Sequence, residues 1–473
     1  MIRVLTSLHR WLAIPLAPLF AMWFASGLVM HFVPYPALSE AERIAGLPPI
    51  DVARVLHGPR EAVAASGVAG AARVRLLQRA DGPVYIVARN GALAALHAED
   101  LTPAGVRTDS LALMLTRGHA RARALAATEA TVAGPIRHDQ WTVAEDLDPH
   151  RPLYRVALND PAGTELYVSS VTGEVVRDST RRERRWNAIG SVAHWIYPTW
   201  LRARPRAWTA TLLLISGLAS IAAIAGAVLG PALLVMRRAL VLPAGSLRAW
   251  HHALGLFCAA FVVSWIVSGW LSLDNGLVFP ARAVSATEAA VLAPAPDWDA
   301  LPADAPVQAP QAKEVEWFFF NGTPYRRDRF DLDTQQLFPD ATAPQASPHR
   351  AFLTLSEIET LARRLPGACS AGAIEARADD FARASVVPGV PVYRIACGDL
   401  WLDVDGASGA IIDRLDPARR AQRVLAGALH TLDVPALSAR PALRSVLVIG
   451  LCGCGLAFSL TGCVLAWRRV CGR

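Results

Sequence analysis

The sequence predicts a membrane protein in which a four-helix transmembrane bundle carries two α+β domains outside the cytoplasm and the chain is internally duplicated. The composition excludes an ordinary soluble protein, because 53% of the 473 residues are hydrophobic and the mean hydropathy is +0.30. Four uncharged apolar stretches are each long enough to cross about 30 Å of hydrocarbon. In addition, motifs from the first half of the chain recur in the second half.

The apolar stretches divide the chain into membrane and aqueous segments. The stretches at 11–33, 207–236, 253–273 and 445–467 contain no Asp, Glu, Lys or Arg. The first is too long for the apolar region of a signal peptide and no Ala-x-Ala-type site follows it, so we interpret it as a retained helix. The predicted order is helix 1 (1–33), outer domain 1 (34–206), helix 2 (207–236), a cytoplasmic loop (237–250), helix 3 (251–273), outer domain 2 (274–444), helix 4 (445–467) and a cytoplasmic tail (468–473).

Arginine residues predict the orientation. The segments on the side of the termini contain no acidic residue but hold Arg3, Arg10, Arg237, Arg238, Arg248, Arg468, Arg469 and Arg473. This bias predicts that both termini and the short loop are cytoplasmic, and that the two large loops lie outside the cytoplasm. The net charge of +7 is mostly this topology signal, and no basic stripe interleaved with aromatic residues indicates nucleic-acid binding.

The cysteines agree with this topology. Only Cys369 and Cys397 fall in an outer domain, whereas the other five lie in or beside the spans. The outer compartment permits a disulfide between them, and two buried thiols are the alternative. No Cys-x-x-Cys-His motif occurs, so any haem is expected to be held without covalent links.

The repeat is defined by two blocks in each half. His9 aligns with His251, and each lies 18 residues before the glycine of a Trp-x-x-Ser-Gly motif that ends at Gly27 or Gly269. Later, His194 aligns with His430, and each is followed by an Arg-Pro pair before the next span. Each half therefore reads as a His-led helix, an outer domain, a histidine, Arg-Pro and a helix.

The loops between these blocks predict small α+β modules. Alternating runs at 84–88, 153–157, 315–320 and 392–396 are typical of strands, and Asp-Gly and Asn-Gly mark turns. The stretch 294–310, which is rich in Pro, Ala and Asp, predicts a linker or surface loop.

Histidines at the spans are the candidate site residues, because an ionisable group there is costly and is usually retained for a partner. They are His9, His31, His194, His251, His252 and His430. They form two layers, since His9 and His251 open helices at the cytoplasmic face and His31, His194 and His430 lie at the outer face. Neutral imidazole is a good axial ligand for haem iron, so two layers in a bundle predict two b-type haems. The structural alternative is hydrogen bonding to water, lipid head groups or carbonyls. The other six histidines are interpreted as surface or packing residues.

Glycine pairs indicate helix packing, and the common motifs of catalytic sites are absent from the sequence. Gly27, Gly217, Gly269 and Gly462 each follow Ser or Thr and predict close packing of helices. No Gly-x-Ser-x-Gly, His-Glu-x-x-His, Gly-x-x-x-x-Gly-Lys or helix-opening Gly-x-Gly-x-x-Gly occurs. A hydrolase, an NTPase and a built-in nicotinamide or flavin site therefore lack support, and we assign no catalytic side chain.

The run His9-Arg10-Trp11-Leu12, the second His-led helix at His251 and the positions of His194 and His430 resemble the PepSY-associated transmembrane protein family. The outer strands ending in Thr172-Gly173-Glu174 resemble PepSY modules. That family includes inner-membrane ferric-siderophore reductases, so the resemblance implies an oxidoreductase of the bacterial inner membrane, embedded in membrane lipid. It would pass electrons from an unknown cytoplasmic donor, through two b haems, to a ferric siderophore at the outer domains.

The resemblance also implies that His9, His251, His194 and His430 are the haem ligands. Two positions stay open, because His252 adjoins His251 and His31 could replace one outer ligand. Two other classes of function are alternatives. One is a membrane-anchored PepSY protein that binds or inhibits a periplasmic peptidase, with structural histidines. The other is a transporter, which the duplicated halves favour but the absence of acidic residues in the spans does not.

Overall fold

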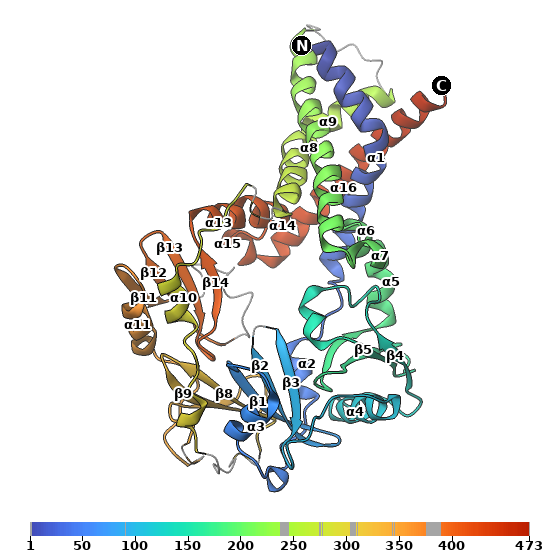
Figure 1. Cartoon of the computed structure of the whole chain (residues 1–473). Helices are drawn as coiled ribbons and strands as arrows, with labels where there is room; N and C mark the ends of the chain where they lie inside the picture. Colours follow the sequence, from blue (N-terminus) through green and yellow to red (C-terminus); the bar gives the residue numbers. More distant parts are fainter. Residues whose placement is uncertain are drawn as a thin grey trace. The chain divides into compact units, whose positions relative to one another are not determined.

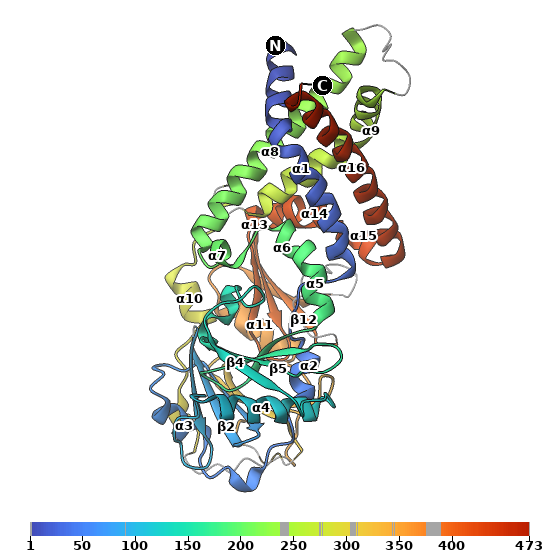
Figure 2. The same cartoon turned by 90° about the vertical axis from the view of Figure 1, so that its right-hand side faces the viewer.

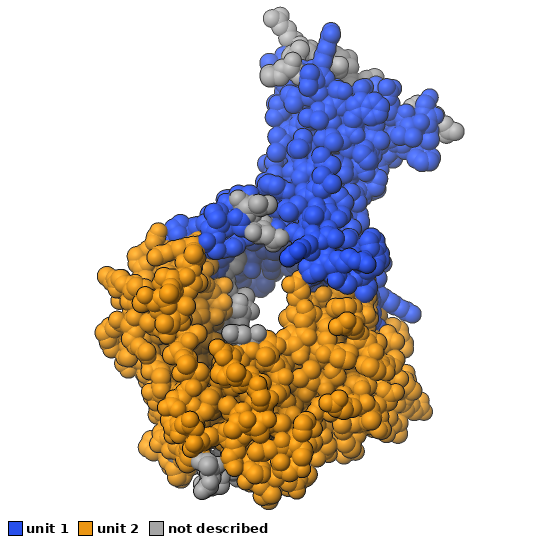
Figure 3. All heavy atoms as spheres, in the orientation of Figure 1, with its two compact units in different colours: residues 1–35, 183–281, 417–473 blue, residues 36–182, 282–416 orange. Residues whose placement is uncertain are grey.

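The computed structural model describes residues 2–89, 91–236, 246–273, 276, 278–302, 309, 311–342, 344, 346–374 and 389–472 (Figures 1 and 2). The chain forms two compact units (Figure 3). We call residues 1–35, 183–281 and 417–473 the helical unit, and residues 36–182 and 282–416 the sheet unit. Arg237, Arg238 and Arg473, which contribute to the predicted orientation, lie outside the described residues.

Four long helices form the helical unit and confirm the four predicted spans. They are α1 (Ile2–Phe32), α8 (Pro205–Met236), α9 (Leu247–Ser272) and α16 (Pro441–Val470). Each helix packs against two neighbours in the cyclic order α1, α16, α9, α8. Large apolar side chains such as Trp11, Phe257 and Trp467 remain exposed, as expected for helices whose outer surface contacts lipid.

Short helices precede the second and fourth spans. Before α8 come α5 (Arg181–Ile189), α6 (Ser191–His194) and α7 (Thr199–Arg202). Before α16 come α13 (Pro417–Gln422), a π-helical turn (Arg423–Ala428), α14 (Leu429–Thr431) and α15 (Pro435–Ser438). The two candidate histidines outside the long helices therefore lie on short, locally folded segments rather than in loops.

Three antiparallel sheets form the sheet unit. The first is six-stranded, in the order β10-β9-β8-β1-β2-β3, and the others are β4-β5-β6-β7 and β11-β12-β13-β14. Strands of the first loop are β1 (Arg73–Arg79), β2 (Gly82–Arg89), β3 (Ala92–His97), β4 (Thr131–Ile136), β5 (Leu153–Ala157), β6 (Glu165–Ser169) and β7 (Val175–Ser179). Strands of the second loop are β8 (Glu314–Phe320), β9 (Thr323–Arg329), β10 (Gln335–Phe338), β11 (Cys369–Ala373), β12 (Val392–Cys397), β13 (Leu400–Asp405) and β14 (Ile411–Leu415).

Helices pack against these sheets. They are α2 (Glu40–Ala45), α3 (Pro59–Ser66), α4 (Asp109–Ala122), α10 (Ala286–Leu292) and α11 (Leu355–Arg364). In each four-stranded module one helix packs against the sheet: α4 packs against β4, β5 and β6, and α11 packs against β11 and β12. Their apolar sides form separate cores, as expected for α+β modules.

The two loops share the six-stranded sheet, which differs from the expectation of a separate domain in each loop. Strand β1 pairs antiparallel with β8, so that Arg75 lies opposite Glu316 and Leu77 opposite Glu314. We call this β1–β8 junction, with the polar face that it shares with β9, the seam. The reason is that β1 would otherwise expose an unpaired edge, which β8 covers with main-chain hydrogen bonds.

The predicted surface loop at 294–310 contributes to the core. Trp298 is only 7% exposed and packs in the cluster that contains Val74, Tyr85 and Trp317. Its indole nitrogen donates a hydrogen bond of 2.6 Å to the carbonyl oxygen of Ala71. This partner explains why an indole can be buried here, because its N–H group is satisfied. Residues 303–308 and 310 of the stretch lie outside the described residues.

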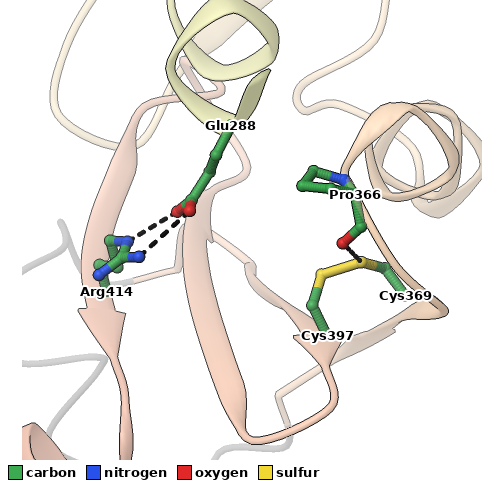
Figure 4. Close-up of a disulfide and its surroundings, with 5 residues drawn as sticks. All are labelled: Glu288, Pro366, Cys369, Cys397 and Arg414. Atoms are coloured by element: carbon green, nitrogen blue, oxygen red, sulfur yellow. Dashed lines mark hydrogen bonds and ion pairs between the residues drawn. A yellow bond between two sulfur atoms is a disulfide. The ribbon is translucent and has the colours of Figure 1, made fainter. Parts of the chain in front are cut away.

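Cys369 and Cys397 form a disulfide, as one of the two sequence interpretations predicted (Figure 4). The residues lie directly opposite each other in the pair β11–β12, with their Cα atoms 4.2 Å apart. The remaining five cysteines are free, and they belong to α9, α16 and the turn after α16.

Candidate functional site

His194 and His430 come together in the helical unit. His194 ends α6 and His430 lies in α14, and the centroids of the two imidazole rings are 6.1 Å apart. A metal ion bound between the two rings would require the ring centroids to be about 6 Å apart, because a metal–nitrogen bond is about 2 Å and each centroid lies about 1 Å beyond its nitrogen. We call these residues the second pair.

Serine residues of the Trp-x-x-Ser-Gly motifs hold both rings. Ser26 Oγ lies 3.0 Å from His194 Nδ1, and Ser268 Oγ lies 3.2 Å from His430 Nδ1. The glycines that follow leave space for the rings. A Cβ at Gly27 would lie 3.6 Å from His194 Cε1, and one at Gly269 would lie 2.9 Å from His430 Cε1. Each Ser-Gly pair therefore contacts one histidine ring in the same way, the first from α1 and the second from α9.

The segment after each histidine has an unusual backbone. Ile196 and Leu432, each two residues beyond its histidine, have φ of 46° and 54°. Such a left-handed conformation costs a non-glycine residue roughly 1–2 kcal/mol. It persists only where the surroundings impose it, and such positions concentrate at functional sites. The π-helical turn before His430 is another feature that is frequent at such sites.

His9 and His251 form a corresponding arrangement, which we call the first pair, near the N-terminal ends of α1 and α9. His9 Nδ1 lies 2.9 Å from the carbonyl oxygen of Ala222, and His251 Nδ1 lies 2.8 Å from Thr461 Oγ1. Gly226 of α8 leaves space for His9, because a Cβ there would lie 2.7 Å from His9 Cε1. A protonated His9 would lie close enough to repel a proton from His251, so the two side chains are in the same part of the bundle.

The hydrogen bonds assign the same tautomer to all four rings. For His9 and His430, the acceptors are the carbonyl oxygens of Ala222 and Trp265, so Nδ1 must carry the proton. His194 and His251 face hydroxyl groups instead. Each hydroxyl donates its only proton to a carbonyl oxygen, from Ser26 to Trp23 and from Thr461 to Phe458, and therefore accepts from Nδ1.

Protonation at Nδ1 leaves Nε2 with a free lone pair in each ring. None of the four Nε2 atoms has a hydrogen-bond partner in the part of the chain that the structure describes. This is the arrangement of histidines that bind metals in proteins, in which the second nitrogen donates to a carbonyl or hydroxyl oxygen and orients the ring. The four side chains would therefore each present the nitrogen through which histidines hold haem iron.

The other two candidates differ from these four. His31 uses Nε2 itself in a 3.0 Å contact with Ser445 Oγ, which occupies the nitrogen that the four rings leave free. His252 has a buried Nε2 without a partner among the described residues, so this ring also retains a free nitrogen. Within the described residues, no group of three or more His, Cys, Asp or Glu side chains could hold a metal ion by itself. Pairs of histidines suit haem, because the porphyrin supplies the remaining ligands.

Several residues of the site were not predicted from the sequence. Ser26, Ser268 and Thr461 precede the glycines that we interpreted as packing residues, and their hydroxyl groups orient the histidines. Gly217 faces Trp270 instead of a histidine, and Gly226 is the residue that leaves space for His9. The repeated Ser/Thr-Gly pairs were the available signal for three of the four rings.

Comparison with known families agrees with the sequence motifs. The family model described as the PepSY-associated TM region matches residues 6–469, which is nearly the whole chain. No curated protein matches the chain.

Proposed function

Because this chain belongs to the PepSY-associated TM family, we propose that it is a di-haem b electron-transfer protein of the bacterial inner membrane. It would reduce a ferric siderophore outside the cytoplasm with electrons from a cytoplasmic donor. We propose further that the halves are a duplication and that the sheet unit lies outside the cytoplasm. The observation that carries the proposal is the common tautomer of His9, His194, His251 and His430, each with a free Nε2.

The chain's own residues would hold and orient each haem. His9 and His251 would bind one group, and His194 and His430 the other. Hydrogen bonds at Nδ1 fix the direction of each ring and increase the basicity of Nε2, which strengthens an axial bond. When bound, haem b supplies reversible one-electron chemistry, which the side chains of this chain lack.

Aromatic and apolar side chains would exclude water between the two pairs. Phe24 of α1 packs against Phe261 and Trp265 of α9, with ring centroids 6.2 and 6.0 Å away. Phe24 and Val262 are buried in the same cluster. A dry, low-dielectric interior of this kind is one of the means by which proteins adjust redox potentials.

The disulfide supports placement of the sheet unit outside the cytoplasm, because structural disulfides persist in oxidising compartments. The arginines near the termini also support this placement, because such residues favour the cytoplasm. A ferric chelate reduced there would release its metal more readily, because chelators built for Fe(III) hold Fe(II) more weakly.

Absorption spectra of the purified protein test the proposal. We expect Soret bands that shift on reduction with dithionite, and two haems per chain. Replacing His194 or His430 with alanine should remove one haem and stop Fe(II) formation from an added ferric siderophore, while the haem at the first pair is still reduced. If the protein is colourless and shows no such bands even after incubation with haemin, the proposal is contradicted. A PepSY binding protein would then be favoured.

Single variants at the two open positions decide the ligand assignment. His31→Ala should keep both haems, because His31 Nε2 already contacts Ser445. His252→Ala should keep them as well. If it instead removes one haem and His251→Ala does not, His252 is the ligand.

A further inference from the structure

The Arg-Pro pairs before the second and fourth spans belong to two strongly basic segments of the helical unit. These segments, 183–206 and 417–444, hold the short helices before α8 and α16, and each contains five arginines, one acidic residue and no lysine. We call them the basic segments. Their helices α7 and α15 lie at the end of the bundle opposite to the chain termini (Figures 1 and 2). The same charge pattern therefore recurs at the start of both spans.

The arginine of each Arg-Pro pair has the same local geometry. Arg204 Nη1 donates a hydrogen bond of 2.8 Å to the carbonyl oxygen of Trp200, and Arg440 Nη1 donates one of 3.3 Å to the carbonyl oxygen of Ala436. Each bond thus reaches back four residues, to the short helix before the span. Both arginines are exposed. Because a guanidinium group has five N–H donors, each side chain keeps donors that can meet a ligand.

No carboxylate neutralises these two arginines. Neither Arg204 nor Arg440 forms an ion pair with any residue that the structure describes. In the sheet unit, by contrast, even the exposed Arg54 pairs with Glu99, at 2.8 Å. An exposed arginine without a counter-charge attracts anions in general, so its neighbours decide which kind of anion fits.

Large apolar side chains are exposed close to both arginines in the sequence. Trp200, which supplies the carbonyl oxygen for Arg204, is 66% exposed. Leu443 and Val446, in the first two turns of α16 after Arg440, are 45% and 66% exposed. A soluble anion would gain nothing from these apolar surfaces. A phospholipid would, because its phosphate can meet the guanidinium group while its acyl chains cover the apolar side chains.

We propose that each Arg-Pro pair binds the head group of one anionic phospholipid, through Arg204 in the first half and Arg440 in the second. Both residues directly precede the proline that begins a membrane-spanning helix, so they lie at the level where hydrocarbon meets water. The planar guanidinium fork binds a phosphate group through two N–H donors at once. Arg206 and Arg444 add positive charge in the same turns, which favours anionic over zwitterionic lipid. The inference goes beyond electron transfer and does not depend on haem.

Native mass spectrometry of the full-length protein in detergent, titrated with phosphatidylglycerol or phosphatidylcholine, tests this proposal. We expect two phosphatidylglycerol molecules to bind more tightly than any phosphatidylcholine. Arg204→Gln and Arg440→Gln should each weaken one of the two sites about fivefold or more, and the double variant should weaken both. Arg204→Lys should weaken its site less than Arg204→Gln, because it keeps the charge but loses the fork.

Arg468→Gln is the matched control. Arg468 is exposed beside the exposed Trp467 at the other end of α16, so its loss should leave both sites unchanged. The thermal unfolding midpoint in lipid-free detergent should also be unchanged in every variant, because Arg204 and Arg440 bond only to carbonyl groups of their own segments.

Four results would overturn the proposal. The first is equal affinity of the wild-type protein for the two lipids, and the second is unchanged affinity for phosphatidylglycerol in the double variant. The third is a loss of lipid binding that accompanies a lower unfolding midpoint, which would show a structural role for the arginines. The fourth is competition by glycerophosphoglycerol, the head group without acyl chains, as strong as that by the phospholipid. In that case the surface binds a soluble anion.

Discussion

Replacing Gly226 with alanine should displace the imidazole of His9. The new Cβ would lie 2.7 Å from His9 Cε1, so the ring must withdraw by about 0.7 Å to reach an ordinary contact of 3.4 Å. That movement disturbs the 2.9 Å hydrogen bond from His9 Nδ1 to Ala222, which is worth about 1 kcal/mol. Overpacking adds about 1–3 kcal/mol, and the higher helix propensity of alanine returns about 1 kcal/mol. The free ring can withdraw from the new Cβ, whereas a ring that holds haem must keep its position. A net cost of about 1–3 kcal/mol borne by the bound state alone corresponds to haem binding at the first pair that is about 5- to 150-fold weaker.

Haem titration of the purified apoprotein measures this effect, and thermal unfolding of the same samples reports the packing cost without haem. Gly450→Ala on α16 is the control, because no heavy atom lies within 4 Å of its Cβ position. Gly462→Ala should also be tolerated, since its Cβ would lie 3.5 Å from His251. If the Gly226 variant behaves like the Gly450 variant in both measurements, the ring does not occupy the position on which our reasoning depends.

Three further predictions concern the sheet unit and its placement. Glu314→Gln should destabilise the seam by about 3–5 kcal/mol, because it removes the buried carboxylate that Arg43 and Arg75 share, and hydrogen exchange in β1 and β8 should then be faster. The exposed pair of Glu99 with Arg54 is the control, and its loss should have a much smaller effect because solvent screens the pair. Burial lowers the pKa of His119 to about 4, so the unfolded state takes up its proton first and the stability present above pH ~6.5 is lost as pH falls toward 4. His119→Leu should remove that part of the acid sensitivity in urea unfolding, and an unchanged pH profile would show that His119 is not its source. After reduction of intact cells, an impermeant maleimide should label the disulfide cysteines but not Cys471, and labelling of Cys471 would refute the predicted orientation.

The spans were predictable from the sequence because they depend on local composition alone. Each uncharged stretch became part of a helix that begins before the stretch does, as at Pro205 and Pro441, where proline occupies the start of a helix. The aligned histidines were also informative. Spacing along the chain predicted which rings share a level of the bundle, and His194 and His430 are indeed neighbours.

The seam could not be predicted, because strand pairing between distant segments leaves no local signal. Nothing near Arg75 or Glu316 in the sequence indicates that the two residues are partners on adjacent strands. The burial of Trp298 has the same origin. A stretch rich in proline and alanine reads as a surface loop until a distant carbonyl group, that of Ala71, accepts the indole hydrogen bond.

Details of the site were also beyond local reasoning. Ile196 is β-branched, so its left-handed backbone contradicts its own conformational preference and follows from tertiary contacts. Gly226 carries no distinguishing neighbour in the sequence, since alanine precedes it where Thr461 precedes Gly462. The direction of each Nδ1 hydrogen bond required coordinates, because the acceptors for His9 and His430 include main-chain carbonyls.

The pairing of β1 with β8 has a consequence for biogenesis. Arg73 and Phe318 are partners across this pair, so the ribosome must add well over two hundred residues before the first loop meets its neighbour. During that interval the guanidinium groups of β1 lack the carboxylates of β8, and its edge is open to any other unpaired strand. The first loop is therefore an incomplete folding intermediate until the third span and the start of the second loop have been made. A truncated chain that ends before β8 would retain this open edge and become a target for chaperones and proteases.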